Sequence, residues 1–299
     1  VPLELRRQRL DDVVLDLLQI EAPQADLVEW GRMVERVKNP SSGTVRIAVV
    51  GKYTELVDAY KSVQQGLIHG GIANDVKVKI EWVSSERYEA GALERHFEGF
   101  DGLLIPGGFG DRGIEGMLMA IEWARENGLP FFGICLGLQC AIIEYARNVS
   151  GRTGANSVEF DPDTEHPVIC LMDSQQQVTT KGGTMRLGEY AASLQEGSRV
   201  EEVYADQEIK ERHRHRYEVN NEYRELFERS GLIMSGTSSD QGLVEVIELP
   251  DHPWFIACQF HPELKSRPNR PHPLFASFIK AAAAHAAGSQ TRAAVGARE

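Results

Sequence analysis

Long hydrophobic runs and paired cysteines are both missing from this sequence. No apolar run approaches the roughly 20 residues that a helix needs to cross a membrane, and the first residues do not resemble a signal peptide. The four cysteines lack the spacing of a zinc site or a disulfide framework. We therefore expect a cytoplasmic protein with no membrane partner and no metal site.

Positive charge is also scarce, because 32 lysines and arginines stand against 44 aspartates and glutamates, which gives a formal net charge of -12. A chain this acidic has no generic affinity for nucleic acid or anionic membranes, so neither is an expected partner. The basic run Arg212–Arg216 is a local exception. It fits a solvated polar face or a phosphate-binding patch. In an extended chain, Arg212, Arg214 and Arg216 would share one side.

The chain changes character near residue 44. From there onward predicted strands alternate with predicted helices, which is typical of a parallel α/β sheet. We predict an α/β fold with an open, mostly parallel sheet flanked by helices. Two amphipathic helices, Leu10–Ile20 and Leu27–Val37, precede a linker signal at Pro40–Gly43. Residues 287–299, rich in alanine, arginine and glycine, are expected to be a disordered tail.

Hydrophobic periodicity predicts the individual elements. The expected strands are Val45–Val50, Val76–Val83, Gly102–Ile105, Pro130–Ile134, Val168–Met172, Ala191–Leu194, Arg216–Val219, Leu232–Ser235, Leu243–Leu249 and Trp254–Gln259. The expected helices are Ala59–Gly71, Ile114–Asn127, Leu136–Arg147, Ile209–Arg214, Asn221–Ser230 and Leu274–Ala287. The polar segment Asp173–Gly188, with its glycine pair, is expected to be a loop.

Cys135 lies where an apolar strand meets a helix, in the sequence Gly-Ile-Cys-Leu-Gly. This G-x-C-x-G arrangement is that of a nucleophile elbow with sulfur in place of a hydroxyl. Gly133 and Gly137 would permit a turn too sharp for side chains, and the start of the following helix favours a thiolate. The alternative is a buried structural cysteine, the commoner fate of a free cysteine.

His261 and Glu263 follow the last predicted strand in the sequence His-Pro-Glu. In an extended chain, residues i and i+2 face the same way, so these two side chains can meet. A carboxylate beside an imidazole sets its tautomer and stabilises the imidazolium. Cys135, His261 and Glu263 would then be a nucleophile, a base and an orienting group. On its own, His-Pro-Glu is more often a surface turn, and the elbow cysteine reverses that preference.

Gly107 and Gly108 lie in the sequence Pro-Gly-Gly-Phe-Gly, directly after the third predicted strand. Sheets of this kind build their sites at the carboxyl ends of the strands. Without side chains, the two glycines would let backbone amides face a reacting oxygen, and with the Leu136 amide they would form an oxyanion hole. A phosphate-binding loop and an ordinary turn are the other interpretations.

Several blocks of sequence resemble one family. The elbow GICLGLQ, the loop PGGFG and the distant HPE are similar to the triad-type (class I) glutamine amidotransferases, whose flavodoxin-like fold carries a nucleophile elbow. The blocks DAYKSV, GANSVEFDPDT, GGTMRLG, ERHRHRYEVNN and HPELKSRPNRPHPLF further resemble the glutaminase domains of the CTP synthase family. The resemblance implies the end of a synthase domain and a linker at 1–43, and a glutaminase domain at 44–286. The first residue, Val1, agrees with a piece of a longer chain.

The resemblance implies that the chain hydrolyses L-glutamine. Cys135 would attack the side-chain amide and release ammonia, with His261 as the base, Glu263 as its orienting group and the Gly108 and Leu136 amides as the oxyanion hole. The implied glutamine-binding residues are Gly108, Leu136, Gly137, Leu138, Gln139, Glu159 and Arg216. Of these, Glu159 would bind the α-ammonium and Arg216 the carboxylate, while Phe109 could pack on the methylenes of the substrate.

Further implications of the resemblance concern the longer protein. No cofactor is expected in this part of the chain, because ATP, Mg²⁺ and UTP would bind to the synthase domain of the same polypeptide. There the ammonia would aminate UTP to CTP. GTP would act as an allosteric effector through a lid at Asp173–Gly188, with Arg186 as the responding residue. The parent enzyme is expected to be a homotetramer.

Two other functions stay open at this point. A stand-alone γ-glutamyl hydrolase or cysteine peptidase of the same fold would share the triad but would not need the NSVEF and RHRYE blocks. A non-catalytic regulatory or interaction domain would keep the fold around an inert Cys135.

Overall fold

The computed structural model describes residues 1–56, 58–87, 97–171 and 185–296. Within these residues, nine strands form a central sheet in the order β2-β1-β3-β4-β12-β11-β10-β7-β8. Its strands are β1 (Thr44–Gly51), β2 (Lys77–Ser84), β3 (Gly102–Ile105), β4 (Phe131–Ile134), β7 (Arg186–Leu194), β8 (Glu208–His215), β10 (Ile233–Ser238), β11 (Val244–Glu248) and β12 (Phe255–Cys258). This open sheet with flanking helices confirms the predicted α/β class.

The sheet changes its pairing at β12. Every neighbouring pair from β2 to β12 is parallel, and every pair from β12 to β8 is antiparallel. The parallel half agrees with the prediction, while the antiparallel half makes the whole sheet mixed. In the parallel half, Ile134 at the end of β4 lies opposite Cys258 at the end of β12. The carboxyl ends of these two strands therefore meet at one edge of the sheet, where such folds place their sites.

Helices cover both faces of the parallel half. The helices on this half are α4 (Lys61–Asn74), α5 (Ile114–Glu126), α6 (Leu136–Asn148) and α10 (Pro273–Gly296), whereas α8 (Arg199–Tyr204) and α9 (Arg224–Arg229) pack against β10 of the antiparallel half. Ala48 and Val50 of β1 pack in the apolar layer that contains α5 and α6. Ile47 and Val49 point to the other face and pack with α4 and α10. Because successive side chains of a strand alternate between faces, a sheet covered on both sides has strands that are apolar throughout.

A smaller sheet is formed by β5 (Ala155–Ser157), β6 (His166–Leu171) and β9 (Tyr217–Val219), in the order β5-β6-β9. Only Arg216 separates β8 of the large sheet from β9 of the small one. This arginine therefore lies at the junction of the two sheets.

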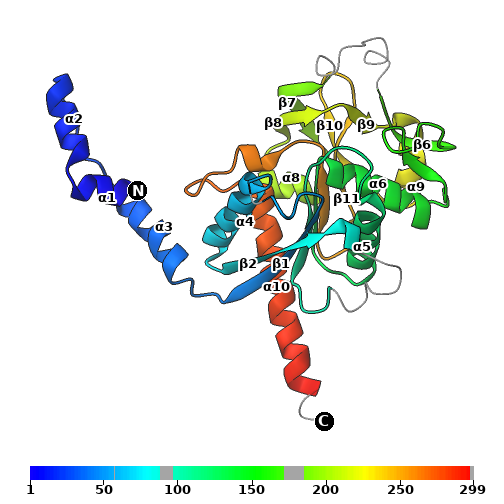
Figure 1. Ribbon diagram of the computed structural model, residues 1–299, viewed down its shortest axis with the longest axis horizontal. Helices are drawn as coiled ribbons and strands as arrows, with labels where there is room; N and C mark the ends of the chain where they lie inside the picture. Colours follow the sequence, from blue (N-terminus) through cyan, green and yellow to red (C-terminus); the bar gives the residue numbers. More distant parts are fainter. Residues whose placement is uncertain (57, 88–96, 172–184, 297–299) are drawn as a thin grey trace.

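The N-terminal helices stand apart from the body of the molecule (Figure 1). They are α1 (Pro2–Arg7), α2 (Leu10–Leu18) and α3 (Val28–Lys38), and none of them buries a residue. At the other end, α10 projects beyond the body and continues to Gly296, past residue 287 where a disordered tail was predicted. The alanine-rich sequence favours the helix, since alanine has the highest helix propensity. None of the helices in the described ranges is both long and apolar enough to cross a membrane.

Residues 209–214 belong to β8, so the predicted helix is wrong here. Ile209, Glu211, His213 and His215 are buried, and the residues between them are exposed. Because three of these four buried side chains are polar, hydrophobic periodicity does not reveal the period of two. The extended conformation places Arg212 and Arg214 on the same, exposed side of the strand.

Candidate active site

Cys135 lies between β4 and α6 and makes the sharp turn itself. Its φ is +52° and its ψ is −98°, a conformation that residues with a side chain rarely adopt. Its backbone N–H donates to the carbonyl of Cys258 at 2.7 Å, so β12 holds the turn in place. Strained backbone of this kind clusters at functional sites. The nucleophile elbow expected from the sequence is therefore present.

The two glycines around Cys135 are required by close packing. A Cβ at Gly133 would lie 2.7 Å from the Cβ of Ala257 and 2.8 Å from the carbonyl carbon of Gly137. A Cβ at Gly137 would lie 2.3 Å from the carbonyl oxygen of Ile105. Neither glycine has a positive φ. The glycines therefore let α6 approach the sheet, while the strained dihedrals belong to the cysteine.

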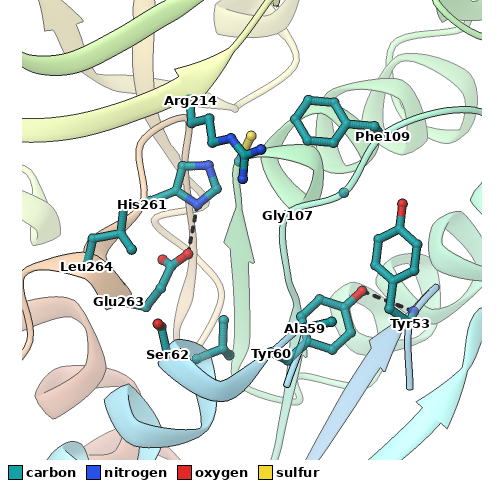
Figure 2. Close-up of a pocket in the computed structure, with 13 residues that line it drawn as sticks. Tyr53, Ala59, Tyr60, Ser62, Gly107, Phe109, Arg214, His261, Glu263 and Leu264 are labelled. Carbon is teal, nitrogen blue, oxygen red and sulfur yellow. Dashed lines mark hydrogen bonds and ion pairs between the residues drawn. The ribbon is translucent and has the colours of Figure 1, made fainter. Parts of the chain in front are cut away.

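His261 and Glu263 form the expected pair, with Nδ1 of the imidazole 2.7 Å from Oε1 of the carboxylate (Figure 2). The local backbone differs from the predicted extended chain, because Pro262–Leu264 form a 3-10 turn. The backbone N–H of His261 donates to the carbonyl of Arg212 at 2.8 Å. His261 is thus fixed between the end of β12 and the backbone edge of β8.

The protonated form of His261 is strongly stabilised. Burial alone would lower the pKa of this imidazole, but the sulfur of Cys135 and the carboxylate of Glu263 together raise it to about 11. Because Glu263 takes Nδ1, Nε2 is the nitrogen left for the sulfur. The arrangement favours an imidazolium beside a thiolate, which is the active form of a cysteine nucleophile.

The loop after β3 packs directly against the nucleophile and the base. A Cβ at Gly107 would lie 2.9 Å from Cε1 of His261, and one at Gly108 would lie 3.0 Å from a methyl group of Leu136. The buried Lys52 donates from Nζ to the carbonyls of Phe109, at 3.1 Å, and Gly110. Leu136 is the first residue of α6, where helix amides have no acceptor within the helix. Gly108 and Leu136 therefore lie against each other next to Cys135, and Gly108 lines the pocket there.

Residues 108–113 read Gly-Phe-Gly-Asp-Arg-Gly, which also fits the dinucleotide pattern G-x-G-x-x-G. In that motif the loop amides face a pyrophosphate. Here the amide of Gly110 donates to Oε1 of Glu159 at 2.8 Å. The carboxylate of Glu159 therefore occupies the position at which a phosphate would accept from the loop, and it would repel a bound phosphate. This arrangement does not favour a dinucleotide.

The predicted substrate residues differ in how they are placed. The side chain of Gln139 is buried, and its Nε2 donates to the carbonyl of Tyr217 at 3.1 Å and to Gln259 at 3.3 Å. Glu159 and Arg216 are both half-buried. Nε of Arg216 is buried and has no hydrogen-bond partner in the described part of the chain.

A pocket of about 450 Å³ opens beside Cys135. Of the predicted residues, Gly107, Gly108, Phe109, Cys135, His261 and Glu263 line it, whereas Leu136–Gln139, Glu159 and Arg216 do not. His261 and Glu263 form one side, with Phe109 and Tyr53 opposite them (Figure 2). The guanidinium of Arg214 lies 5.8 Å from the centre of the Phe109 ring.

Several residues that line the pocket were not predicted from the sequence. Tyr53, Tyr60, Ser62, Arg214 and Leu264 all line the pocket without having been predicted there. Arg214 had a signal, since an extended RHRHR run places it beside Arg212 on the exposed side. Tyr60 lies in the block DAYKSV that resembles the family, but neither it nor Tyr53 was given a role, because aromatic residues at such positions are usually part of the core.

Arg186 occupies a different environment from the one predicted. It is the first residue of β7 and is only 5% exposed, so it does not belong to a loop. Its guanidinium lies 2.8 Å from Oε1 of Glu245 and 3.5 Å from Oε1 of Glu218, above the ring of Tyr190. The predicted lid is thereby shortened, and most of it, residues 173–184, lies outside the described residues.

This ion pair belongs to a buried polar network behind His261. Burial raises the pKa of Glu218 to about 8 and that of Glu245 to about 7, although Arg186 opposes both shifts. Burial also lowers the pKa of His213 to about 2 and that of His215 to about 3, so both imidazoles are neutral. The network joins β7, β8, β9 and β11 and so connects the two sheets.

No group of three histidine, cysteine, aspartate or glutamate side chains is placed to hold a metal ion in the described part of the chain.

Comparison with known proteins identifies the family. The family model described as Glutamine amidotransferase class-I matches residues 55–281. CTP synthases of Caldanaerobacter subterraneus and Clostridium acetobutylicum are each 55% identical, over 281 and 282 residues. Each match covers 94% of this chain and 52% of the relative, so the chain spans about half the length of these curated proteins.

A solved structure agrees with these relatives. The glutaminase domain of Trypanosoma brucei CTPS with bound acivicin is 40% identical, with a TM-score of 0.75, and the match covers 80% of this chain and 94% of that one. A peptidase, a stand-alone hydrolase or a non-catalytic domain is not favoured by these similarities. The chain therefore belongs to the class I glutamine amidotransferases and, within them, to the glutaminase domains of CTP synthases.

Proposed function

We propose that this chain hydrolyses L-glutamine to glutamate and ammonia through Cys135, His261 and Glu263. The observation that carries the proposal is the strained elbow cysteine beside an imidazole whose pKa is raised to about 11. Family membership supplies the substrate class. In the longer protein, the ammonia would serve the ATP-dependent amination of UTP to CTP.

The reaction begins with attack of the Cys135 thiolate on the side-chain carbonyl of glutamine. The negative charge that develops on the carbonyl oxygen is stabilised by the amides of Gly108 and Leu136. The imidazolium of His261 gives its proton to the leaving nitrogen, so ammonia departs and a γ-glutamyl thioester remains. Neutral His261 then removes a proton from water, hydroxide adds to the thioester, and glutamate leaves with regeneration of the thiolate. Glu263 stabilises the imidazolium in both stages.

The ends of glutamine would be held by opposite charges. Glu159 would bind the α-ammonium, and Arg216, with its unpartnered Nε, would bind the carboxylate. Phe109 borders the pocket and offers an apolar surface to the two methylenes. Gly137 and Leu138, in the first turn of α6, would contact the substrate from the elbow side. Gln139 would act through its contacts with Tyr217.

The remaining partners of the reaction would belong to the longer protein. Residues 1–43 would be the end of its synthase domain and a linker, 44–286 the glutaminase domain and 287–299 a tail. ATP, Mg²⁺ and UTP would bind in the synthase domain, with no cofactor in the glutaminase domain. The whole enzyme would be a cytoplasmic homotetramer.

Covalent labelling tests the proposed function. We expect 6-diazo-5-oxo-norleucine, an electrophilic glutamine analogue, to add once, at Cys135, and excess L-glutamine to prevent the addition. Peptide mass spectrometry locates the adduct, and a Cys140→Ala protein serves as a control because Cys140 lies in α6 outside the pocket. Absence of the adduct from both this chain and the full-length protein with GTP would contradict the proposal.

Arg186 is the residue through which we propose that GTP activates hydrolysis. An Arg186→Ala change alone would leave Glu218 and Glu245 buried without their cation, which is strongly destabilising. The test therefore uses the double variant Arg186→Met/Glu245→Gln, and the single variant Glu245→Gln is its matched control. In full-length protein, we expect GTP to activate the single variant and to leave the double variant unstimulated. Full activation of the double variant in a GTP titration would refute the role.

A further inference from the structure

Gln259 is a buried residue that lies next to the proposed catalytic cysteine. It follows β12 directly, two residues before His261, and has no exposed surface. Its backbone N–H donates to the carbonyl of Glu245 at 2.8 Å, so its main chain is fixed by β11. Its side-chain Nε2 lies 3.7 Å from the sulfur of Cys135, within the range of a hydrogen bond to sulfur.

The orientation of this amide follows from its neighbours. A backbone carbonyl only accepts hydrogen bonds, so the carbonyl of Tyr217 must face the NH₂ group of Gln139. The same nitrogen lies 3.3 Å from the side-chain oxygen of Gln259. With its oxygen committed to Gln139, Gln259 must present its own NH₂ group to the sulfur. Gln139 thus donates to both Tyr217 and Gln259, and Gln259 donates in turn to Cys135.

We propose that Gln259 is a catalytic-site residue that donates an N–H to the sulfur of Cys135, and that Gln139 is a positioning residue that keeps this donor turned toward the sulfur. The inference deepens the proposed function, on which it rests, by naming a second group that stabilises the nucleophile. The donor is a neutral amide, so it stabilises the negative sulfur without protonating it.

The surroundings of Cys135 explain the need for such a donor. The cysteine is only 3% exposed and packs in an apolar layer with Ile134 and Cys258. A buried anion is costly unless charges or hydrogen bonds compensate it. His261 supplies a charge on the pocket side of the sulfur, and Gln259 supplies a hydrogen bond. Tyr217, whose carbonyl accepts from Gln139, adjoins Arg216, so the proposed substrate-binding segment and the nucleophile share one hydrogen-bond network.

The test is the reactivity of Cys135 toward iodoacetamide, which requires no glutamine. The adduct at Cys135 is measured by peptide mass spectrometry over a series of pH values, which also separates it from the half-exposed Cys170. In Gln259→Met, we expect the alkylation rate at pH 7 to fall about tenfold and the pH of half-maximal rate to rise by about one unit. Gln259→Glu, which places a carboxylate beside the sulfur, should slow alkylation further and provides the test if Gln259→Met does not fold.

Two comparisons separate the proposed contact from general destabilisation. Gln139→Leu, which releases the amide of Gln259, should slow alkylation in the same direction but by a smaller factor. Ile256→Val removes one buried methyl group from β12 and should leave the pH profile unchanged. The titratable groups that act on Cys135, His261 and Cys258, remain in all these variants.

These measurements distinguish failure of the Gln259 inference from failure of the proposed glutaminase function. A Gln259→Met protein that is folded and alkylates with the wild-type rate and pH profile would overturn the inference. If Gln259→Met shows the expected change in the pH profile of alkylation, but the unmodified protein does not hydrolyse glutamine, the inference is supported and the proposed function is contradicted. In an active enzyme, we expect Gln259→Met to lower kcat about tenfold and to change KM less than twofold, because the lost contact is to the nucleophile and not to the bound glutamine.

Discussion

Replacing Cys135 with alanine is expected to reduce glutamine hydrolysis by a factor on the order of 10⁴ or more. No other described side chain at the pocket can form the thioester, because the neighbouring thiols of Cys140 and Cys258 are buried and do not line it. Burial raises the pKa of Cys140 to about 12, so this thiol remains protonated. Ammonia release measured with a coupled assay provides the test.

The Cys135→Ala protein should nevertheless remain folded. Only one sulfur atom is lost, and the strained φ of +52° is retained. In Cys135→Gly, relief of this strain should increase the free energy of unfolding by about 1 kcal/mol. Cys140→Ala, on the same helix, is the matched control and should keep its activity while losing about 1 kcal/mol of stability. More than 1% residual hydrolysis in Cys135→Ala, on the order of a hundredfold above the level expected here, would contradict the assignment of the nucleophile.

The Gly137→Ala substitution should damage both stability and activity. The new Cβ would lie 2.3 Å from the carbonyl oxygen of Ile105 and 3.1 Å from its Cβ, so α6 would have to move away from β3. We expect the free energy of unfolding to fall by about 3 kcal/mol or more, the upper range for overpacking. Because Leu136 starts the same helix, its amide would move too, and kcat should fall by about 10²-fold or more. Urea unfolding and glutaminase assays measure the two effects.

Gly154→Ala is the matched control for this substitution. A Cβ at Gly154 has no atom within 4 Å, and its φ is not positive. We therefore expect unfolding and hydrolysis close to those of the unmodified protein. A Gly137→Ala protein with the stability of this control would show that α6 tolerates a wider separation from the sheet than the structure indicates.

The parallel half of the sheet could be predicted well because its strands are apolar on both sides. Gly102–Ile105 coincides with β3, and Val45–Val50 lies within β1. The antiparallel half was harder, because its interior includes Glu211, His213 and His215 on β8 and Arg186 on β7. Polar side chains that satisfy one another inside the fold have the sequence pattern of exposed ones. Their burial depends on partners from other strands, which a local pattern cannot include.

The residues of the candidate site could be predicted where they lie in short sequence motifs. Cys135, His261 and Glu263 each lie in a local pattern, and the structure brings His261 and Glu263 within 2.7 Å. Gln259 sits two residues before His261, yet its contacts with Cys135 and Gln139 depend on the pairing of β12 with β4. A role of this kind requires the three-dimensional arrangement, since no spacing in the sequence indicates it.

The pairing of β4 with β12 also has a consequence for how the protein acquires its reactivity. The elbow around Cys135 is local, whereas His261 lies more than a hundred residues further along the chain. Contacts of such large sequence separation carry a large loop-closure entropy and form slowly. A chain that has completed β3, β4 and α6, but has not yet added β12, therefore holds a thiol without its base. Cys135 therefore stays unactivated until β12, the last strand of the parallel half, has paired with β4. This order protects the incompletely folded chain from side reactions of its own nucleophile.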